Sequence, residues 1–424
     1  MKNTFTGAKG IFTVDRLSYN ILMLLSENFH GRHGCPCRSR RFSWFEVYAY
    51  LLWPATPVQP CWFMETKLLF MLGRPFAPLY GALMRMREGC YRHGLFTSER
   101  LPVPVISVGN LTLGGTGKTP MVQFLSRLLL EHGYRPAVIS RGYGGSTKEA
   151  VNVVSDGRDV LLPADLVGDE PRLLAETLPG VMVLTGVVRR LPARHAVDMG
   201  ADVLLLDDGF QHMAVARDLD LVLFSADHLA GNSRIFPGGD LREPVAALNR
   251  CSCFVLTNVT NDNKQKADRF GSLLRQRFPE KSIFMSSTRV TQYVRRDDAN
   301  RFTLLGEKPV VCDRALALCG IARPESFKKT LIDCNIDVCD FLAMPDPHNY
   351  TEADLARIRK RIKKQGARCV VTTEKDMVKL GRVDLGVPVY GLRLQVEVEK
   401  ELTAMVLMTV SGYLQKQNGS TGLE

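Results

Sequence analysis

Residues 104–120 read PVISVGNLTLGGTGKTP, and this stretch decides the fold. A short apolar run ends at Gly109, a glycine-rich turn follows, and a helical pattern continues from Pro120 to His132. Backbone N–H groups of such a turn, at the start of a helix, point at phosphate oxygens. The turn differs from the common GxxxxGK[ST] pattern only in having Thr112 as its first residue. The residues predicted to bind a nucleotide are Thr112, Leu113, Gly114, Gly115, Thr116, Gly117, Lys118 and Thr119.

Continuous apolar runs follow this turn along the chain. They are AVIS (137–140), VMVL (181–184), DVLLLDD (202–208), LDLVLF (219–224) and CFVLTN (253–258). Continuous runs are typical of strands that are buried on both faces, as in a parallel sheet with helices between its strands. The sequence therefore predicts an α/β protein with a doubly wound parallel sheet of the P-loop NTPase type.

A second, smaller α/β domain is expected after a connector. Apolar and polar residues alternate around 285–310, which predicts a two-stranded connector. Further apolar runs at 315–321, 337–344, 369–374 and 387–392 predict the smaller domain over 311–424. The expected organisation is completed by a weakly patterned extension at 1–60, amphipathic helices at 61–102 and the P-loop domain at 103–284.

Composition and charge narrow the class of protein. The 424 residues are 45% hydrophobic and 23% charged, which excludes a disordered or collagen-like chain. Residues 1–100 hold 13 Lys or Arg and 6 Asp or Glu, so +7 of the net charge of +11 lies in the first quarter. The 11 cysteines have no zinc-site spacing and are expected to be reduced thiols.

The N-terminal region has the features of a segment at a membrane surface. Apolar stretches at 47–64 and 68–86 are interrupted by prolines and accompanied by tryptophans and basic residues. Apolar bulk with a basic rim suits a helix that lies in the headgroup layer without spanning the bilayer. Packing of the same residues on their own domain is the alternative.

Polar residues follow several of the predicted strands. Asp207 and Asp208 end a buried strand, where a carboxylate can hold Mg²⁺ together with the Thr119 hydroxyl, while Lys118 bridges phosphates. Arg141, GDEP (168–171), Gln211-His212 and Arg242-Glu243 also follow predicted strands. Ligands of open α/β sheets bind at the carboxyl ends of the strands, so these groups predict one cleft. Each of them alone is more often a helix cap or a surface charge, and it is their concentration in loops after strands that favours a shared site.

Eight segments, taken in order, resemble the tetraacyldisaccharide 4′-kinase family, the lipid A kinases of Gram-negative bacteria. They are PVPVISVGNLTLGGTGKTP, SRGYGG, GDEP, LLLDDGFQH, RDLDLVLF, FPGGDLREP, GIARPESF and VTTEKDMVKL, and the resemblance covers roughly residues 64–395. It implies transfer of the γ-phosphate of ATP to the 4′-hydroxyl of tetraacyldisaccharide 1-phosphate, which gives lipid IVA. It further implies Mg²⁺ as cofactor and a monomer held peripherally at the cytoplasmic face of the inner membrane.

The resemblance also implies roles for single residues. Lys118, Asp169 and His348 would be catalytic, and Thr119, Asp207 and Asp208 would hold the metal ion. The residues implied to bind the lipid substrate are Glu170, Arg189, His212, Arg242 and Glu243. One position departs from the family, which has Asp-His where this chain reads Asp346-Pro347. Proline cannot exchange a proton, so the adjacent His348 is the candidate replacement for the histidine that pairs with Asp169.

Two other classes of function remain open on the sequence alone. One is a different ATP-dependent P-loop enzyme on the same scaffold, such as a ligase. The other is a membrane or nucleic-acid binder that has lost catalysis. No RRM-like, zinc-finger or long Lys/Arg signature is present, so nucleic acid is not an expected partner.

Overall fold

The computed structural model of the chain describes residues 5–6, 11–12, 69–297, 301–305, 313–345, 348–381 and 383–420. The chain divides into two compact units, Met1–Trp53 and Pro54–Glu424. In the first unit, β1 (Phe5–Thr6) and β2 (Ile11–Phe12) pair antiparallel. The remainder of the expected extension at 1–60, and residues 61–68 of the expected helices, lie outside the described residues.

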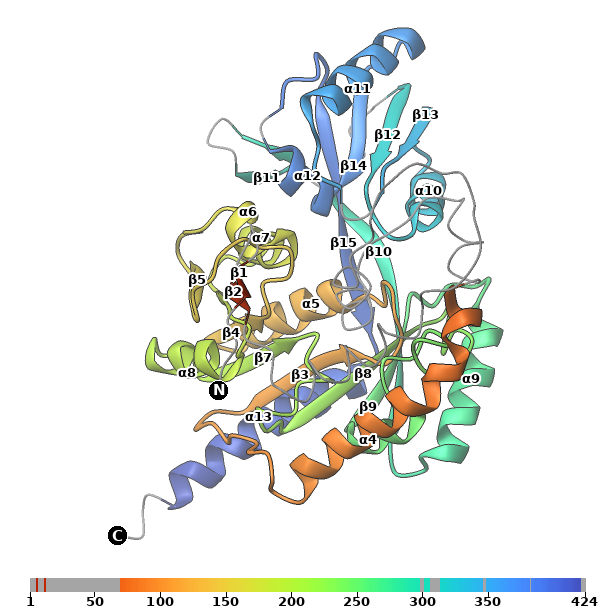
Figure 1. Ribbon diagram of the computed structural model, residues 1–424. Coiled ribbons are helices and arrows are strands. Elements are labelled where there is room, and N and C mark those ends of the chain that lie inside the picture. The colour runs from red at the N-terminus through yellow and green to blue at the C-terminus, as the bar shows by residue number, and fades with distance from the viewer. Residues whose placement is uncertain are drawn as a thin grey trace. The chain divides into compact units, whose positions relative to one another are not determined.

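The second unit is built on a 13-stranded sheet (Figure 1). Its order is β13-β12-β14-β15-β10-β9-β8-β3-β7-β4-β6-β5, and β11 pairs with β10 outside this path. The strands are β3 (Val105–Asn110), β4 (Pro136–Ser140), β5 (Asn152–Asp156), β6 (Met182–Thr185), β7 (Val203–Asp207), β8 (Leu219–Ser225), β9 (Cys253–Thr257), β10 (Ser282–Arg296), β11 (Phe302–Leu304), β12 (Ala315–Cys319), β13 (Val338–Ala343), β14 (Cys369–Thr373) and β15 (Val389–Val398).

Helices connect these strands. They are η1 (Arg74–Phe76), α4 (Ala77–Arg92), α5 (Lys118–Glu131), α6 (Ala164–Val167), α7 (Asp169–Thr177), α8 (Arg190–Asp198), η2 (Val245–Arg250), α9 (Lys264–Arg277), α10 (Pro324–Asp333), α11 (Glu352–Gln365), α12 (Glu374–Leu380) and α13 (Lys400–Ser420).

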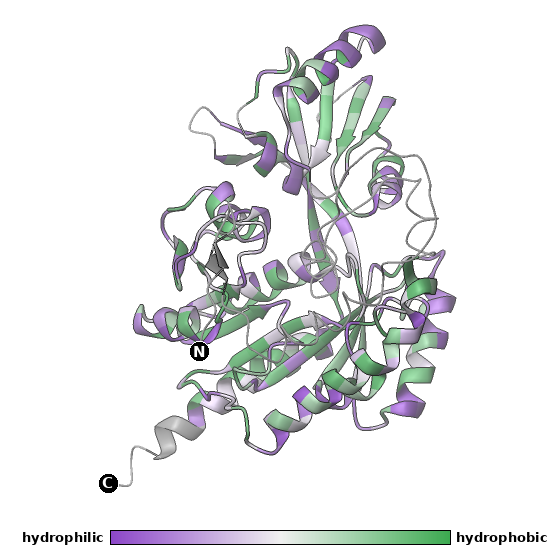
Figure 2. Ribbon diagram, viewed as in Figure 1, coloured by the Kyte–Doolittle hydropathy of each residue, from purple (hydrophilic) through white to green (hydrophobic). Residues whose placement is uncertain are grey.

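The predicted doubly wound sheet is confirmed. Strands β6, β4, β7, β3, β8 and β9 run parallel, and every residue of these strands is buried. Alternate residues of β8 belong to different core clusters: Leu221 and Leu223 pack with α5, whereas Val222 and Phe224 pack with α9. Figure 2 shows the corresponding concentration of hydrophobic residues along the sheet. Burial on both faces is the reason that these runs are continuous rather than alternating.

The connector between the two α/β parts differs from the expectation. β10 does pair antiparallel with β11, but its main partner is β15, from Ser286 opposite Val398 to Val294 opposite Gly391. The chain therefore returns from the smaller part to the first one along β15. Leu402 of α13 then joins the core that surrounds α5. Helix α13, which was expected in the smaller domain at 311–424, therefore packs in the core of the P-loop part.

The helical segment that runs through η1 into α4 leaves an apolar stripe exposed. Leu72, Phe76, Leu79, Leu83 and Met86 follow one another at intervals of three or four residues, and each is at least 43% exposed. None of the helices in the described residues has the length and apolar character that crossing a bilayer requires.

Among the described residues, the cysteines match the expectation of reduced thiols except at one position. Free thiols are found at Cys90, Cys251, Cys253, Cys319, Cys334 and Cys339. Cys369 is disulfide-bonded, so the expectation of reduced thiols is wrong at that position.

Candidate active site

The glycine-rich turn connects β3 to α5, as predicted. Gly117 precedes α5 with a φ of 80°, a left-handed conformation that glycine adopts without strain. The Thr257 hydroxyl at the end of β9 donates to the Thr116 carbonyl at 2.7 Å. On the other side, the Leu113 amide donates to the Asp240 carbonyl at 2.8 Å. The eight predicted phosphate-binding residues therefore lie in this turn and in the first two positions of α5, and neighbouring loops hold the turn in place.

Lys118 and Asp208 meet at the carboxyl edge of the sheet. The Lys118 ammonium lies 3.5 Å from Asp208 Oδ1 and donates to Asn110 Oδ1 at 3.2 Å. Arg242 donates to both Asp208 oxygens, at 3.0 and 2.8 Å, and Arg189 donates to the Asp208 carbonyl at 2.8 Å. Although burial opposes the charge of Asp208, Lys118 and Arg242 hold its pKa well below the usual range. Asp208 is thus a fixed anion at the lysine of the phosphate loop.

Asp207 has a different environment from its neighbour. It is 3% exposed, and the Ser140 hydroxyl lies 3.3 Å from its Oδ2. Burial, followed by the negative charges of Glu170 and Asp208, raises its pKa to about 7. A buried carboxylate with one long hydrogen bond is a group that a cation would stabilise. In the described residues, no three His, Cys, Asp or Glu side chains gather into a preformed metal cage.

Cationic side chains line the region behind the two aspartates. Arg189 is 5% exposed, and Arg141 follows β4. Burial, together with the charge of Arg189, lowers the pKa of Arg141 to about 10. Burial and the surrounding arginines lower the pKa of His212 to about 3, so this imidazole is neutral at physiological pH. The charge of this region suits an anionic ligand.

The GDEP segment begins a helix beside the RGYGG loop. A Cβ atom on Gly168, whose φ is 94°, would collide with the Tyr143 carbonyl, so the two loops can approach only because this residue is glycine. Asp169 and Glu170 then form the first turn of α7, where the helix dipole favours negative charge. The Lys379 ammonium of α12 lies 3.5 Å from Asp169 Oδ2, and that of Lys375 lies 3.3 Å from Glu170 Oε1.

His348 does not contact Asp169 in the described residues. Its Nε2 lies 3.1 Å from Asp354 Oδ2, and its ring packs edge-to-face on Tyr350 with a centroid separation of 5.0 Å. Asp346 and Pro347, which carry the departure from the family pattern, lie outside the described residues. The Asp169–His348 pair therefore stays a prediction.

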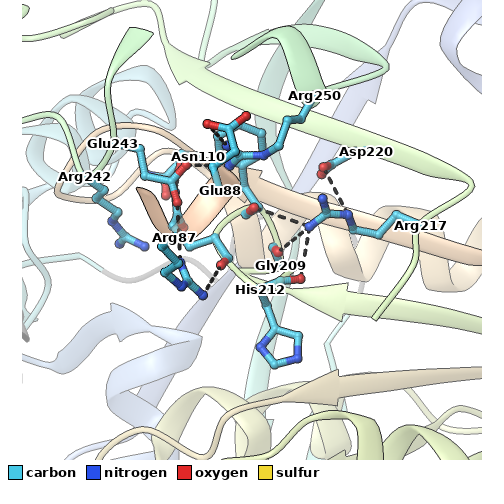
Figure 3. Close-up of polar contacts among 12 residues, drawn as sticks. Arg87, Glu88, Asn110, Gly209, His212, Arg217, Asp220, Arg242, Glu243 and Arg250 are labelled. Carbon is cyan, nitrogen blue, oxygen red and sulfur yellow. Dashed lines mark hydrogen bonds and ion pairs between the residues drawn. The ribbon is translucent and has the colours of Figure 1, made fainter. Parts of the chain in front are cut away.

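Glu243 is buried in an ion-pair cluster, and its expected role in substrate binding stays a prediction. It is 3% exposed, and Arg250 donates to its Oε2 at 2.5 Å. Arg87 of α4 lies 3.9 Å from its other oxygen. Figure 3 shows these side chains with Glu88 in one polar cluster beside Asn110. A contact with substrate would first have to break this buried pairing, so the geometry gives Glu243 a supporting position.

Comparison with known proteins identifies the family. The sequence model of the tetraacyldisaccharide-1-P 4′-kinase family matches residues 69–411. The chain belongs to this family. Two curated relatives, both named tetraacyldisaccharide 4′-kinase, support the assignment. The protein from Desulfotalea psychrophila is 42% identical over 354 residues, which cover 82% of this chain and 99% of the relative. The protein from Syntrophus aciditrophicus is 41% identical over 337 residues, which cover 77% of this chain and 88% of the relative.

A solved structure of the 4′-kinase family agrees with the fold. The crystal structure of LpxK from Aquifex aeolicus in complex with ATP has a TM-score of 0.63 and 28% sequence identity. The match covers 79% of this chain and 98% of the crystallised chain. The expected α/β fold with a phosphate loop is thus shared with a 4′-kinase that binds ATP.

Three residues near the candidate site were not predicted from the sequence. Arg323 of the second α/β part donates to the Ser225 hydroxyl at 3.0 Å and passes beside Gly114 of the phosphate loop. Lys379 pairs with Asp169, and Arg87 reaches Glu243. The motifs GIARPESF and VTTEKDMVKL contain the first two residues, but their spacing carries no sign of which loop they face.

Proposed function

We propose that this chain transfers the γ-phosphate of ATP to the 4′-hydroxyl of tetraacyldisaccharide 1-phosphate, forming lipid IVA. The observation that carries the proposal is the position of the phosphate-loop lysine, Lys118, 3.5 Å from the strand-end Asp208, with the adjacent Asp207 under the charges of both Lys118 and Glu170 of the GDEP segment. Membership of the 4′-kinase family names the reaction, and this geometry supplies the groups that such a reaction needs.

The turn from Thr112 to Gly117 would bind the ATP phosphates through backbone amides, with Lys118 at the β- and γ-phosphates. The residues fit Mg²⁺, because Asp207 is buried with one long hydrogen bond and Thr119 is the second residue of α5. Both oxygens of Asp208 are held by Arg242, so we assign the metal contact to Asp207 and Thr119 first. When bound, the ion would neutralise charge on the transferred phosphoryl group.

Asp169 is the proposed acceptor of the substrate proton. The 4′-oxygen forms a bond to the γ-phosphorus, the bond from that phosphorus to the β–γ bridging oxygen breaks, and ADP leaves. The proton of the 4′-hydroxyl passes to the Asp169 carboxylate, which must first exchange its contact with Lys379 for one with substrate. A carboxylate is adequate here because phosphoryl transfer depends mainly on positioning and charge neutralisation. His348 is proposed to support Asp169 when α12 and its neighbouring loops close on the site.

The substrate is an anionic lipid, and two surfaces suit its two ends. Arg141, Arg189 and neutral His212 form a polar region for the sugar and phosphate. The exposed stripe from Leu72 to Met86, on η1, α4 and the helical turn before them, would rest among acyl chains. We therefore place the protein peripherally at the cytoplasmic face of the inner membrane and expect a monomer.

The experiment is a transfer assay with purified full-length chain, Mg-ATP labelled at the γ-phosphate, and the disaccharide lipid in mixed micelles. Lys118→Ala and Asp169→Ala should each lose turnover while circular dichroism stays that of the wild type. Turnover at the wild-type rate in either variant would contradict the assigned role. A different P-loop enzyme, or a catalytically impaired membrane binder, would give no labelled lipid with the wild-type chain.

A further inference from the structure

Helix α4 has two faces that touch different surroundings. Its exposed stripe of Leu79, Leu83 and Met86 is the face proposed to lie in lipid. A neighbouring face carries Tyr80 and Arg87, seven residues apart and hence on one side of the helix after about two turns. Both of these side chains contact a loop of the site rather than belonging to the exposed stripe.

The inward face contacts the loops that follow β7 and β8. The Tyr80 hydroxyl donates to the Arg242 carbonyl at 3.0 Å. The Arg87 guanidinium donates to the Gln211 carbonyl at 3.0 Å through one nitrogen and lies 3.9 Å from Glu243 through the other. α4 is thus attached to both segments that carry proposed site residues, LDDGFQH and GGDLREP.

Further hydrogen bonds connect these contacts of α4 to the phosphate loop. Gln211 donates from its side chain to the Asn110 carbonyl at 2.8 Å, and Asn110 accepts from Lys118 at 3.2 Å. Tyr80 donates to the backbone carbonyl of Arg242, and the side chain of Arg242 donates to both carboxylate oxygens of Asp208. The anion beside Lys118 is therefore held by a residue whose backbone is fixed from α4.

Positive and negative charges are balanced in the cluster formed by Arg87, Glu88, Glu243 and Arg250. Arg250 pairs with Glu243 at 2.5 Å and with Glu88 of α4 at 3.3 Å, and its guanidinium lies 4.7 Å from the Phe210 ring centroid. Two acids and two arginines therefore meet in a mostly buried site (Figure 3). Pairs of this kind fix geometry more than they add stability, because desolvation offsets the attraction.

We propose that Arg87 is a positioning residue for phosphoryl transfer. It holds the Gln211 and Glu243 segments against α4, so that the helix facing the lipid also sets the Arg242–Asp208–Lys118 geometry. Arg87 need not touch ATP or the sugar to do this. The inference rests on the proposed function but adds a step to it, since a lipid-surface helix could bind membrane without supporting the site.

The test is Arg87→Leu in the full-length chain. Glu243 keeps Arg250 as its partner in this variant, so no buried carboxylate is left unpaired. We expect kcat to fall by about 10- to 100-fold, the scale that a displacement of about 1 Å in a positioned group produces. The KM for ATP and sedimentation with vesicles of phosphatidylethanolamine and phosphatidylglycerol should change by less than about 3-fold, because their contacts lie elsewhere.

Two further variants keep the inference falsifiable if Arg87→Leu folds poorly. Tyr80→Phe removes one hydroxyl and should lower kcat by about 3- to 10-fold, the value of one hydrogen bond of about 1 kcal/mol. Arg87→Lys keeps the charge but not the two-pronged contact, so it should recover part of the loss. Arg135→Leu removes an exposed arginine that pairs with Asp202 and serves as the charge control.

The outcomes separate the inference from the function. Wild-type kcat in both Arg87→Leu and Tyr80→Phe would overturn the inference while leaving the proposed function intact. Full recovery in Arg87→Lys, together with weakened vesicle binding in Arg87→Leu, would also overturn it, because charge alone would then explain the effect. Absence of lipid phosphorylation by the wild-type chain would instead contradict the proposed function.

Discussion

The pair of Lys379 and Asp169 gives the sharpest prediction, because stability and catalysis should respond to it in different ways. The Lys379 side chain is 2% exposed and Asp169 is 23% exposed, with 3.5 Å between Nζ and Oδ2. At an effective dielectric constant near 20, two unit charges at this distance attract by about 5 kcal/mol. Partial exposure of Asp169 screens the pair, so Asp169→Asn should lower the free energy of unfolding by about 2–4 kcal/mol by leaving a buried ammonium without its counter-charge.

The double variant Asp169→Asn/Lys379→Met provides the decisive comparison. Methionine is close to lysine in volume and needs no counter-charge, so at least half of the lost stability should return. Turnover should not return, because the proposed base is absent from both variants and its loss is expected to lower kcat by about 10²- to 10⁴-fold. Urea denaturation and the transfer assay measure the two quantities separately.

A neighbouring ion pair supplies the matched control. Lys375 and Glu170 lie 3.3 Å apart between the same two helices, but their side chains are 23% and 50% exposed. Glu170→Gln should therefore change the unfolding free energy by no more than about 1 kcal/mol. The reasoning is refuted if Asp169→Asn unfolds within about 0.5 kcal/mol of the wild type, or if the double variant is no more stable than the single one.

Three other predictions follow from the geometry of the site and of α4. Arg242→Met removes the charged nitrogen, Nη1, that donates to both oxygens of Asp208, so kcat should fall by about 10-fold or more in the transfer assay, and an unchanged value would contradict a role for this contact. The double variant Leu79→Glu/Leu83→Glu should abolish sedimentation with anionic vesicles. The control Leu273→Glu, at an exposed leucine of α9, should bind vesicles like the wild type. Equal binding by all three proteins would contradict the proposed contact of the stripe with lipid. The lowered pKa of His212 means that the folded state keeps this imidazole neutral while the unfolded state protonates it below about pH 6.5, so its contribution to stability falls as the pH drops from 6.5 toward 5. Urea denaturation should show a shallower loss over that range in His212→Gln, by up to about 1.4 kcal/mol per pH unit, and identical slopes would contradict the burial argument.

The sequence was informative wherever a property is local. The strand, turn and helix around Lys118 are contiguous, and Asp207 ends a strand that lies directly beside β3. Parallel strands place their carboxyl ends together, so proximity of Asp208 to Lys118 could be expected without coordinates. Continuous apolar runs likewise predicted a sheet covered on both faces.

Local sequence patterns could not predict which distant segments of the chain pair with one another. Nothing in the alternation of β10 indicates that its main partner is β15, about a hundred residues later, and so the place of α13 in the first core could not be expected. The burial of Glu243 depends on Arg87 and Arg250 meeting it from two different segments. A sequence motif shows that a charged residue is present, but only tertiary packing decides whether it faces ligand or another side chain.

The most direct test of the account follows the labelled phosphate. Purified chain, Mg-ATP carrying ³²P at the γ-position and the tetraacylated disaccharide 1-phosphate are incubated in mixed micelles, and the lipid is extracted and its phosphorylated hydroxyl located by mass spectrometry. The account predicts label on the 4′-oxygen with the wild-type chain and none with Lys118→Ala. Label released as inorganic phosphate, or bound at another hydroxyl, would contradict it.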